Sequence, residues 1–173
     1  METGAVVRRL RSPRVLGWRA WTVTETPAGV RLGSVIYEAV WAPGEVTRAL
    51  CLHDEAPPHE VPGPDCGCGF HAAHDPVDAI SYLRGRDDLR TIGRVLGEVA
   101  LSGAIVATEK GWRAEAACPA RLYVEDAEIA TALTVYGVPV LSSECASPSF
   151  PTCTATPSHS APSWRTSNAK TLT

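Results

Sequence analysis

The chain has 173 residues and a mass of 18.4 kDa, with 45% hydrophobic and 20% charged residues, a composition that excludes wholesale disorder. The formal net charge is −3, and no run approaches the roughly 18–20 consecutive apolar residues that a membrane-spanning helix needs. One domain of about 100–150 residues with extensions is therefore the simplest interpretation.

The chain begins with a basic extension over residues 1–14, which holds four arginines and one glutamate. Residues 15–141 carry ten basic and seventeen acidic residues, a balance unsuited to gripping phosphates over a broad face. Any contact with nucleic acid is therefore expected to be local. The pair Val6-Val7 is far shorter than the apolar core of a secretory signal, so we expect a cytoplasmic protein.

After the basic extension, the first elements that the sequence predicts are strands. Residues 17–24 are rich in aromatic and β-branched side chains and are followed by the turn sequence Thr-Pro-Ala-Gly at 26–29. Extended chain is expected again over 30–32, 34–41 and 46–52, with breaks at glycines and prolines. Short strands joined by tight turns are typical of an antiparallel meander.

A helix is predicted over 76–84, because Asp75 can cap it, Pro76 suits its first position and Val77, Ile80 and Leu83 recur on one face. Bent strands are expected over 91–106, which contain glycines at 93, 97 and 103. Further strands are expected over 111–118, ended by Pro119, and over 121–124. A second helix is predicted from Asp126 to about residue 135, ending near Gly137.

The end of the chain, residues 142–173, has eighteen Ser, Thr or Pro residues and three charged ones. Such a composition cannot bury enough surface to fold alone, so we expect a disordered tail. The fold prediction is therefore α+β: one β-rich domain over 15–141, mainly an antiparallel meander or small barrel, with two short helices and a zinc loop.

Metal-ligating residues are concentrated between residues 51 and 71. Zinc prefers a tetrahedron of thiolates and imidazoles, and we predict the ligands Cys51, His59, Cys66 and Cys68. The pair Cys66 and Cys68 is separated by one residue rather than the two to four of common zinc knuckles, although the glycines at 67 and 69 can let the backbone fold around a metal. The alternatives are His53 or His71 in place of His59, free thiols, or a redox cysteine pair. Cys118 lies in an apolar segment and is predicted to be buried.

Four stretches resemble an uncharacterised bacterial family, mostly from actinobacteria and their mobile elements, with a Cys-x-Cys-Gly loop followed by a barrel-like segment. They are WAPGEVTRALC (41–51), PGPDCGCGFHA (62–72), IGRVLGEVALSGAIVATEKGWRAEAACPARLYV (92–124) and ALTVYGVPV (132–140). The resemblance implies an architecture but no activity. Members carry Tyr or an apolar residue near His71, which favours His59 over His71 as a ligand.

The pattern around Gly-Trp-Arg-Ala-Glu at 111–115 is also similar to small barrels of the PUA and ASCH type, which hold a modified base or nucleotide in a pocket. This resemblance implies binding roles for Trp112, Arg113 and Glu115, through stacking and reading of a base edge or phosphate. The alternative from the residues alone is that Trp112 fills the core and Arg113 pairs with Glu115 on one strand face.

Enzyme signatures are absent from the sequence: there is no phosphate loop, no nucleophile elbow, no His-Glu-x-x-His and no zinc-deaminase pattern. Two function classes follow. The first is a non-catalytic zinc-stabilised recognition or adaptor module that binds a nucleotide, a nucleic acid or a protein. The second is a small zinc-dependent hydrolase or nucleotide-modifying enzyme with Glu60 or Glu115 as base.

Overall fold

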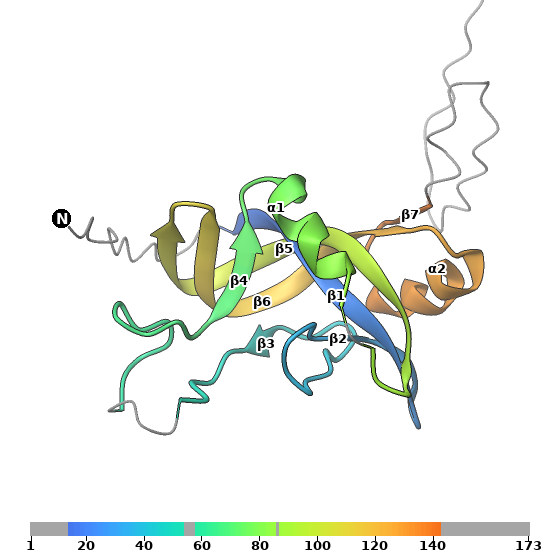
Figure 1. Cartoon of the computed structure of the whole chain (residues 1–173), viewed down its shortest axis with the longest axis horizontal. Helices are drawn as coiled ribbons and strands as arrows, with labels where there is room; N and C mark the ends of the chain where they lie inside the picture. Colours follow the sequence, from blue (N-terminus) through green and yellow to red (C-terminus); the bar gives the residue numbers. More distant parts are fainter. Residues whose placement is uncertain (1–13, 54–57, 86, 143–173) are drawn as a thin grey trace, which may run out of the picture. The chain divides into compact units, whose positions relative to one another are not determined.

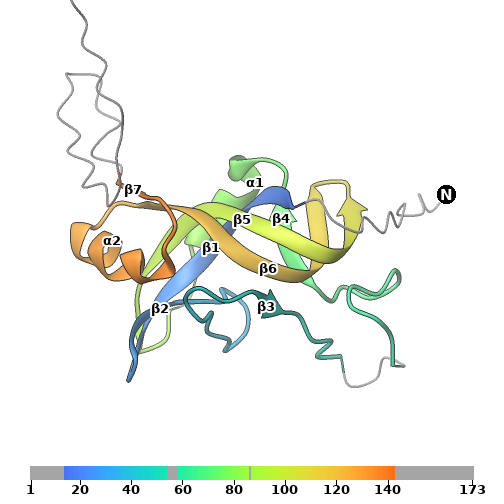
Figure 2. The same cartoon turned by 180° about the vertical axis from the view of Figure 1, so that it is seen from behind.

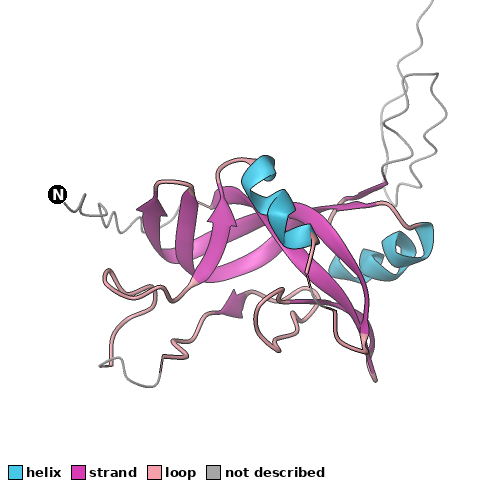
Figure 3. Cartoon of the chain, in the orientation of Figure 1, coloured by secondary structure: helices cyan, strands magenta, loops and turns pink. Residues whose placement is uncertain are grey.

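The computed structural model describes residues 14–53, 58–85 and 87–142 (Figure 1). The expected extension over 1–14 and tail over 142–173 lie outside these residues, except for Arg14 and Ser142. The described part is α+β and mostly strand, with two short α-helices, as Figure 3 shows, so the predicted fold class is confirmed.

Three long strands form the centre of the sheet: β1 (Val15–Thr26), β5 (Thr91–Thr108) and β6 (Gly111–Val124). β5 lies between the other two and pairs antiparallel with both. The predicted hairpin at the start of the body is confirmed, because β1 turns directly into β2 (Gly29–Gly33) with Gly29 at a φ of 98°.

The other edge of β6 pairs in succession with three short strands. These are β4 (Phe70–Ala73) and β3 (Thr47–Arg48), both antiparallel, and β7 (Val140–Ser142), which is parallel. β4 also meets β1, at the single pair Trp18 and Ala73. The strands β1, β5, β6 and β4 thus form a ring, but one pair closes it, so the ring is not a regular barrel.

The predicted break at Pro119 is wrong, because β6 runs through it. The strand accommodates the proline with a bulge, where the register between β5 and β6 shifts next to the pair Val99 and Pro119. A second shift lies between Ser102 and Ile105 and holds Gly103 at a φ of 77°. The bent strands that the glycines at 93, 97 and 103 predicted are thus parts of one long strand, β5.

Two predicted strands are largely loop. Residues 34–41 form only an isolated bridge between Gly33 and Val40, and the strand expected over 46–52 shrinks to β3. The chain leaves the sheet so that Trp41 can pack edge-on against Trp21 in the core, at a ring distance of 5.6 Å. Burial of one large aromatic side chain therefore outweighs the strand preference of its neighbours.

Both predicted helices form, and the aspartates cap them. The Asp75 side chain accepts from the backbone of Val77 at the start of α1 (Pro76–Ile80), which continues as the 3₁₀ turn η1 (Ser81–Leu83). Asp126 does the same for α2 (Ala127–Leu133), followed by η2 (Thr134–Tyr136). No helix of the described residues is long and apolar enough to cross a membrane.

The prediction of which face of α1 is buried is wrong. Val77 is 72% exposed and Ile80 is 47% exposed, whereas Ala79 is buried. This helix of five residues contacts β1 and β4, Ala79 is its one buried residue, and it does not present a continuous apolar stripe.

The core lies between the strands and α2. Its fully buried side chains include Trp21, Trp41, Leu101, Ile105, Leu122 and Leu133. The Tyr136 hydroxyl, at the end of η2, donates to the Trp41 carbonyl at 2.7 Å and accepts from the Leu32 backbone at 2.8 Å. Figure 2 shows α2 beside β7, at one end of the long strands.

Candidate metal centre

The four predicted metal ligands meet in the loop between β3 and β4. One ligand atom from each of Cys51, His59, Cys66 and Cys68 lies within 4.8 Å of all the others. The described residues between Arg48 and Phe70 form neither helix nor strand, so no regular structure of the loop itself holds them together. Cys68 is buried, and the other three side chains are partly exposed.

Two of the distances in this cluster are close to those of a coordination site. Cys51 Sγ lies 3.7 Å from Cys66 Sγ, and His59 Nε2 lies 3.3 Å from Cys68 Sγ. In a tetrahedral zinc site, bond lengths of about 2.3 Å to sulfur and about 2.0 Å to nitrogen place two sulfurs about 3.8 Å apart and sulfur and nitrogen about 3.5 Å apart. A disulfide would need about 2.05 Å between sulfurs. The cluster can therefore hold a metal ion.

The two alternative histidines take different places. His53 Nδ1 lies 3.4 Å from Cys66 Sγ and 3.7 Å from Cys51 Sγ, at the rim of the cluster. His71 Nε2 donates to the Gly67 carbonyl at 2.8 Å, which fastens the loop to β4. His53 is thus a neighbour of the thiolates, and His71 is a support for the backbone that carries them.

Backbone N–H groups stabilise the thiolates. The Gly63 N–H donates to Cys68 Sγ at 3.3 Å. The pKa of Cys66 is lowered to about 7, mainly because the Cys68 backbone N–H donates to its sulfur, against the opposing effect of partial burial. The pKa of Cys51 is raised: the His53 backbone lowers it, but partial burial and the neighbouring Cys66 and Cys68 outweigh that effect. The Cys66 thiol thus ionises readily, and its negative charge disfavours ionisation of Cys51.

Two glycines shape the loop, and a third does not. Gly69 has a φ of 110°, which side chains rarely adopt, and an added Cβ would lie 3.0 Å from the Pro62 side chain. At Gly63 an added Cβ would lie 2.6 Å from the His59 ring. Gly67 meets nothing within 4 Å, so the loop requires glycine at 69 but not at 67.

Arg113 on β6 fixes this loop to the sheet. Its side chain is almost fully buried, and Nη1 donates to three loop carbonyls: Gly63 at 3.2 Å, Cys66, and Cys68 at 3.3 Å. Two of these carbonyls belong to predicted metal ligands. The sequence signal for this role is weak, since it is only an arginine within an apolar strand.

The expected pairing of Arg113 with Glu115 is wrong. Glu115 forms an ion pair with Arg48 of β3 and accepts from the Ala104 backbone at 3.1 Å. The second register shift of β5 and β6 lies opposite Glu115 and opens the backbone there to the carboxylate. Arg113 therefore contacts the metal loop, whereas Glu115 contacts the bulge of β5.

Trp112 and Cys118 are less buried than predicted. Trp112 is partly buried against the core, and its ring meets the His74 ring edge-on at a centroid distance of 4.0 Å. Cys118 is also only partly buried. Burial therefore varies along β6: Arg113, which contacts the metal loop, is buried, whereas Trp112 and Cys118 are only partly buried.

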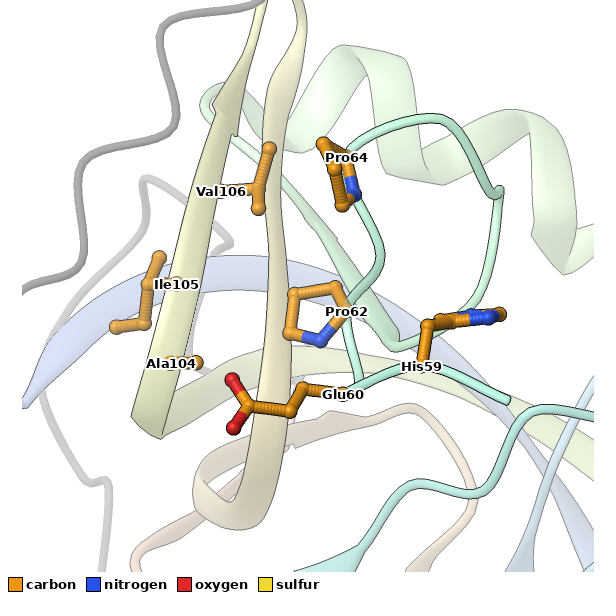
Figure 4. A pocket seen from close by; sticks show the side chains of 7 residues that line it. All are labelled: His59, Glu60, Pro62, Pro64, Ala104, Ile105 and Val106. Carbon is orange, nitrogen blue, oxygen red and sulfur yellow. The ribbon is translucent and has the colours of Figure 1, made fainter. Parts of the chain in front are cut away.

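A small cavity of about 460 Å³ lies between the loop and β5 (Figure 4). His59, Glu60, Pro62 and Pro64 line it from the loop, and Ala104, Ile105 and Val106 line it from the strand. In Figure 4 the Glu60 carboxylate points towards Ala104, whereas the His59 ring points away from the strand. Glu60 and His59, although adjacent in sequence, therefore do not converge on one point.

Comparison of the chain with protein-family models, with curated proteins and with solved structures found no match, so its function follows from the chemistry of its own sites.

Proposed function

We propose that the protein is a non-catalytic binding module whose loop is held by one structural zinc ion on Cys51, His59, Cys66 and Cys68. Three thiolates and an imidazole are the donors that zinc prefers, and thiolate-rich sets disfavour magnesium and calcium. Reduced thiols fit a cytoplasmic protein, the location we propose. The grouping of four donor atoms within 4.8 Å is the observation that carries this proposal.

The number of ligands supports a structural site. A catalytic zinc keeps one position open for water, whereas four protein ligands fill a tetrahedron. The two ends of the loop also need a cross-link, because its described residues form no helix or strand between β3 and β4. A metal would join Cys51, near β3, to Cys66 and Cys68, near β4, and its binding energy would become folding energy.

The second candidate function, metal-dependent hydrolysis, has less support. It needs a carboxylate that can activate a metal-bound water. Glu60 lines the small cavity with its carboxylate towards Ala104, on the side away from the His59 ring (Figure 4). Glu115 is engaged by Arg48 and by the Ala104 backbone. Neither glutamate is directed at the cluster.

Nucleotide or nucleic-acid recognition through Trp112, Arg113 and Glu115 stays a proposal. Arg113 and Glu115 have partners within the protein. Trp112 lines a second, larger cavity and is the member of the three that is open to a ligand. Of the three residues, Trp112 is therefore the one for which we keep a binding role as a proposal.

Metal analysis of purified variants tests the zinc proposal. We expect about one zinc per chain in the wild type, and loss of both metal and thermal stability in Cys68→Ser and His59→Ala. Cys118→Ser and His53→Ala are the matched controls and should keep the metal. Replacement by cobalt should give the visible spectrum of a tetrahedral thiolate site. Stoichiometric zinc in Cys68→Ser, or its loss from Cys118→Ser, would refute the ligand set.

A further inference from the structure

A second cavity, of about 890 Å³ and larger than the one beside the metal loop, lies among β1, β3, β4, η1 and the loops at 34–41 and 49–53. Nine aromatic residues lie between 14 and 142, and six of them line this cavity. They are Trp18, Tyr37, Trp41, Phe70, Tyr82 and Trp112. The volume falls within the range of about 300–1,000 Å³ that small-molecule sites occupy, and aromatic walls suit a flat ring.

Three cationic side chains line the cavity, Arg19, Arg48 and Lys110, and Arg19 of β1 is the one that lies over its aromatic rings. Its guanidinium carbon is 5.4 Å from the Trp41 ring centroid and 5.9 Å from that of Phe70. Nη1 donates to the His71 carbonyl at 2.6 Å, while Nε is buried and has no hydrogen-bond partner. Burial lowers the pKa of Arg19 to about 10, with Tyr82 opposing the shift.

No carboxylate of the described residues forms an ion pair with Arg19. The acidic residues that line the cavity are Glu38 and Asp78, and neither is within 4.0 Å of the guanidinium. Other arginines in the same sheet are paired: Arg48 with Glu115, Arg94 with Asp87 and Arg121 with Glu98. Arg19 is partly buried, with its Nε fully enclosed, and a charge in such a place without a counter-charge is costly and marks a site where a ligand can supply one.

We infer that this cavity binds a small ligand in which an oxyanion, a carboxylate or a phosphate, is joined to a planar ring. Arg19 would bind the oxyanion through the planar hydrogen-bond geometry that guanidinium shares with both groups. The aromatic side chains would hold the ring, with Trp112 among them. The inference rests on the proposed function, because His53, Gly67 and Cys68 of the metal loop form part of the wall.

Calorimetric titration with matched probes tests the inference. The phosphate arm compares AMP with adenosine and UMP with uridine, and the carboxylate arm compares indole-3-carboxylate with indole-3-carboxamide. We expect one arm to bind, and the anion to bind at least about tenfold more tightly than its neutral analogue, since a charge-assisted hydrogen bond is lost. The arm that binds identifies the source of the oxyanion.

The variant Arg19→Met should weaken that binding by about tenfold or more while keeping the zinc content. The control Arg121→Gln changes an arginine outside the cavity and should bind as the wild type does. Where Arg19→Met does not fold, the wild-type comparison of anions with neutral analogues decides alone.

Three results would overturn the inference: no binding in either arm, equal binding of anion and neutral analogue, or binding only of single-stranded RNA or DNA longer than one nucleotide. Zinc is measured in the same samples. Zinc without ligand binding refutes the cavity and leaves the metal module intact, whereas absence of zinc refutes the proposed function.

Discussion

Replacement of Arg113 by Met should weaken the attachment of the metal loop to the sheet. The variant removes one nearly buried guanidinium that donates to the carbonyls of Gly63, Cys66 and Cys68, and keeps the aliphatic volume. A hydrogen bond from a charged donor contributes about 1.5–3 kcal/mol, and a carbonyl left buried without a donor costs about 1–3 kcal/mol. Relief from burying the cation offsets part of this loss.

We therefore expect a net loss of about 3 kcal/mol in the free energy of unfolding. For a domain of this size, such a loss corresponds to a fall of about 10 °C in melting temperature. The control is Arg121→Met on the same strand: the Arg121 side chain is 44% exposed, and its guanidinium pairs with Glu98 at 3.0 Å. An exposed pair is worth at most about 1 kcal/mol, so this variant should lose little.

Melting curves with and without a chelator separate a loop anchor from a general core residue. Removal of the metal should loosen the loop and with it the carbonyls that Arg113 holds, so the difference between Arg113→Met and wild type should shrink after chelation. The variant should also lose zinc to a competing chelator sooner. An unchanged difference together with unchanged zinc affinity would refute the anchoring role.

Three further outcomes are expected. Gly69→Ala should cost about 1–3 kcal/mol and weaken zinc retention because of the positive φ, whereas Gly67→Ala should do neither; melting curves and metal analysis check both, and equal behaviour would contradict the loop geometry. Burial raises the pKa of the Tyr136 phenol, so its contribution to stability should be present below about pH 10 and lost as the pH rises through the folded-state pKa; Tyr136→Phe should show less of this alkaline loss in denaturant titrations, and an identical pH profile would refute it. Trp112→Ala should cost about 2–3 kcal/mol yet stay folded, because the ring is only partly buried, and circular dichroism that showed an unfolded chain would indicate a full core role.

Local signals in the sequence predicted the elements that depend on neighbours in the chain. The turn at Gly29, the caps at Asp75 and Asp126 and the end of η2 at Gly137 each follow from the conformation of one or two residues. The metal cluster was predictable for a similar reason, since its donors are close in sequence and few other roles suit them.

What the sequence did not predict depends on which distant segments meet. Arg113 reaches the loop because β4 and β6 pair with His71 opposite Arg113, and no local pattern encodes that register. The exposure of Val77 and Ile80 follows from the way in which α1 contacts the sheet, which buries Ala79 instead. Arg19 was overlooked because a charged residue in an alternating strand is normally assigned to the solvent face.

The ring of strands sets an order of events during synthesis. β1 can pair with β2 at once, but its other edge must wait for β5, where Val15 meets Leu101, and the Tyr136 hydroxyl joins Leu32 across 104 positions of the chain. At about 5–20 residues per second, β5 leaves the ribosome several seconds or more after β1. During that interval β1 presents an open strand edge, which invites pairing with other chains. Contacts of such long range also slow folding. The edge of β1 is thus open to pairing with other chains until β5 has been made.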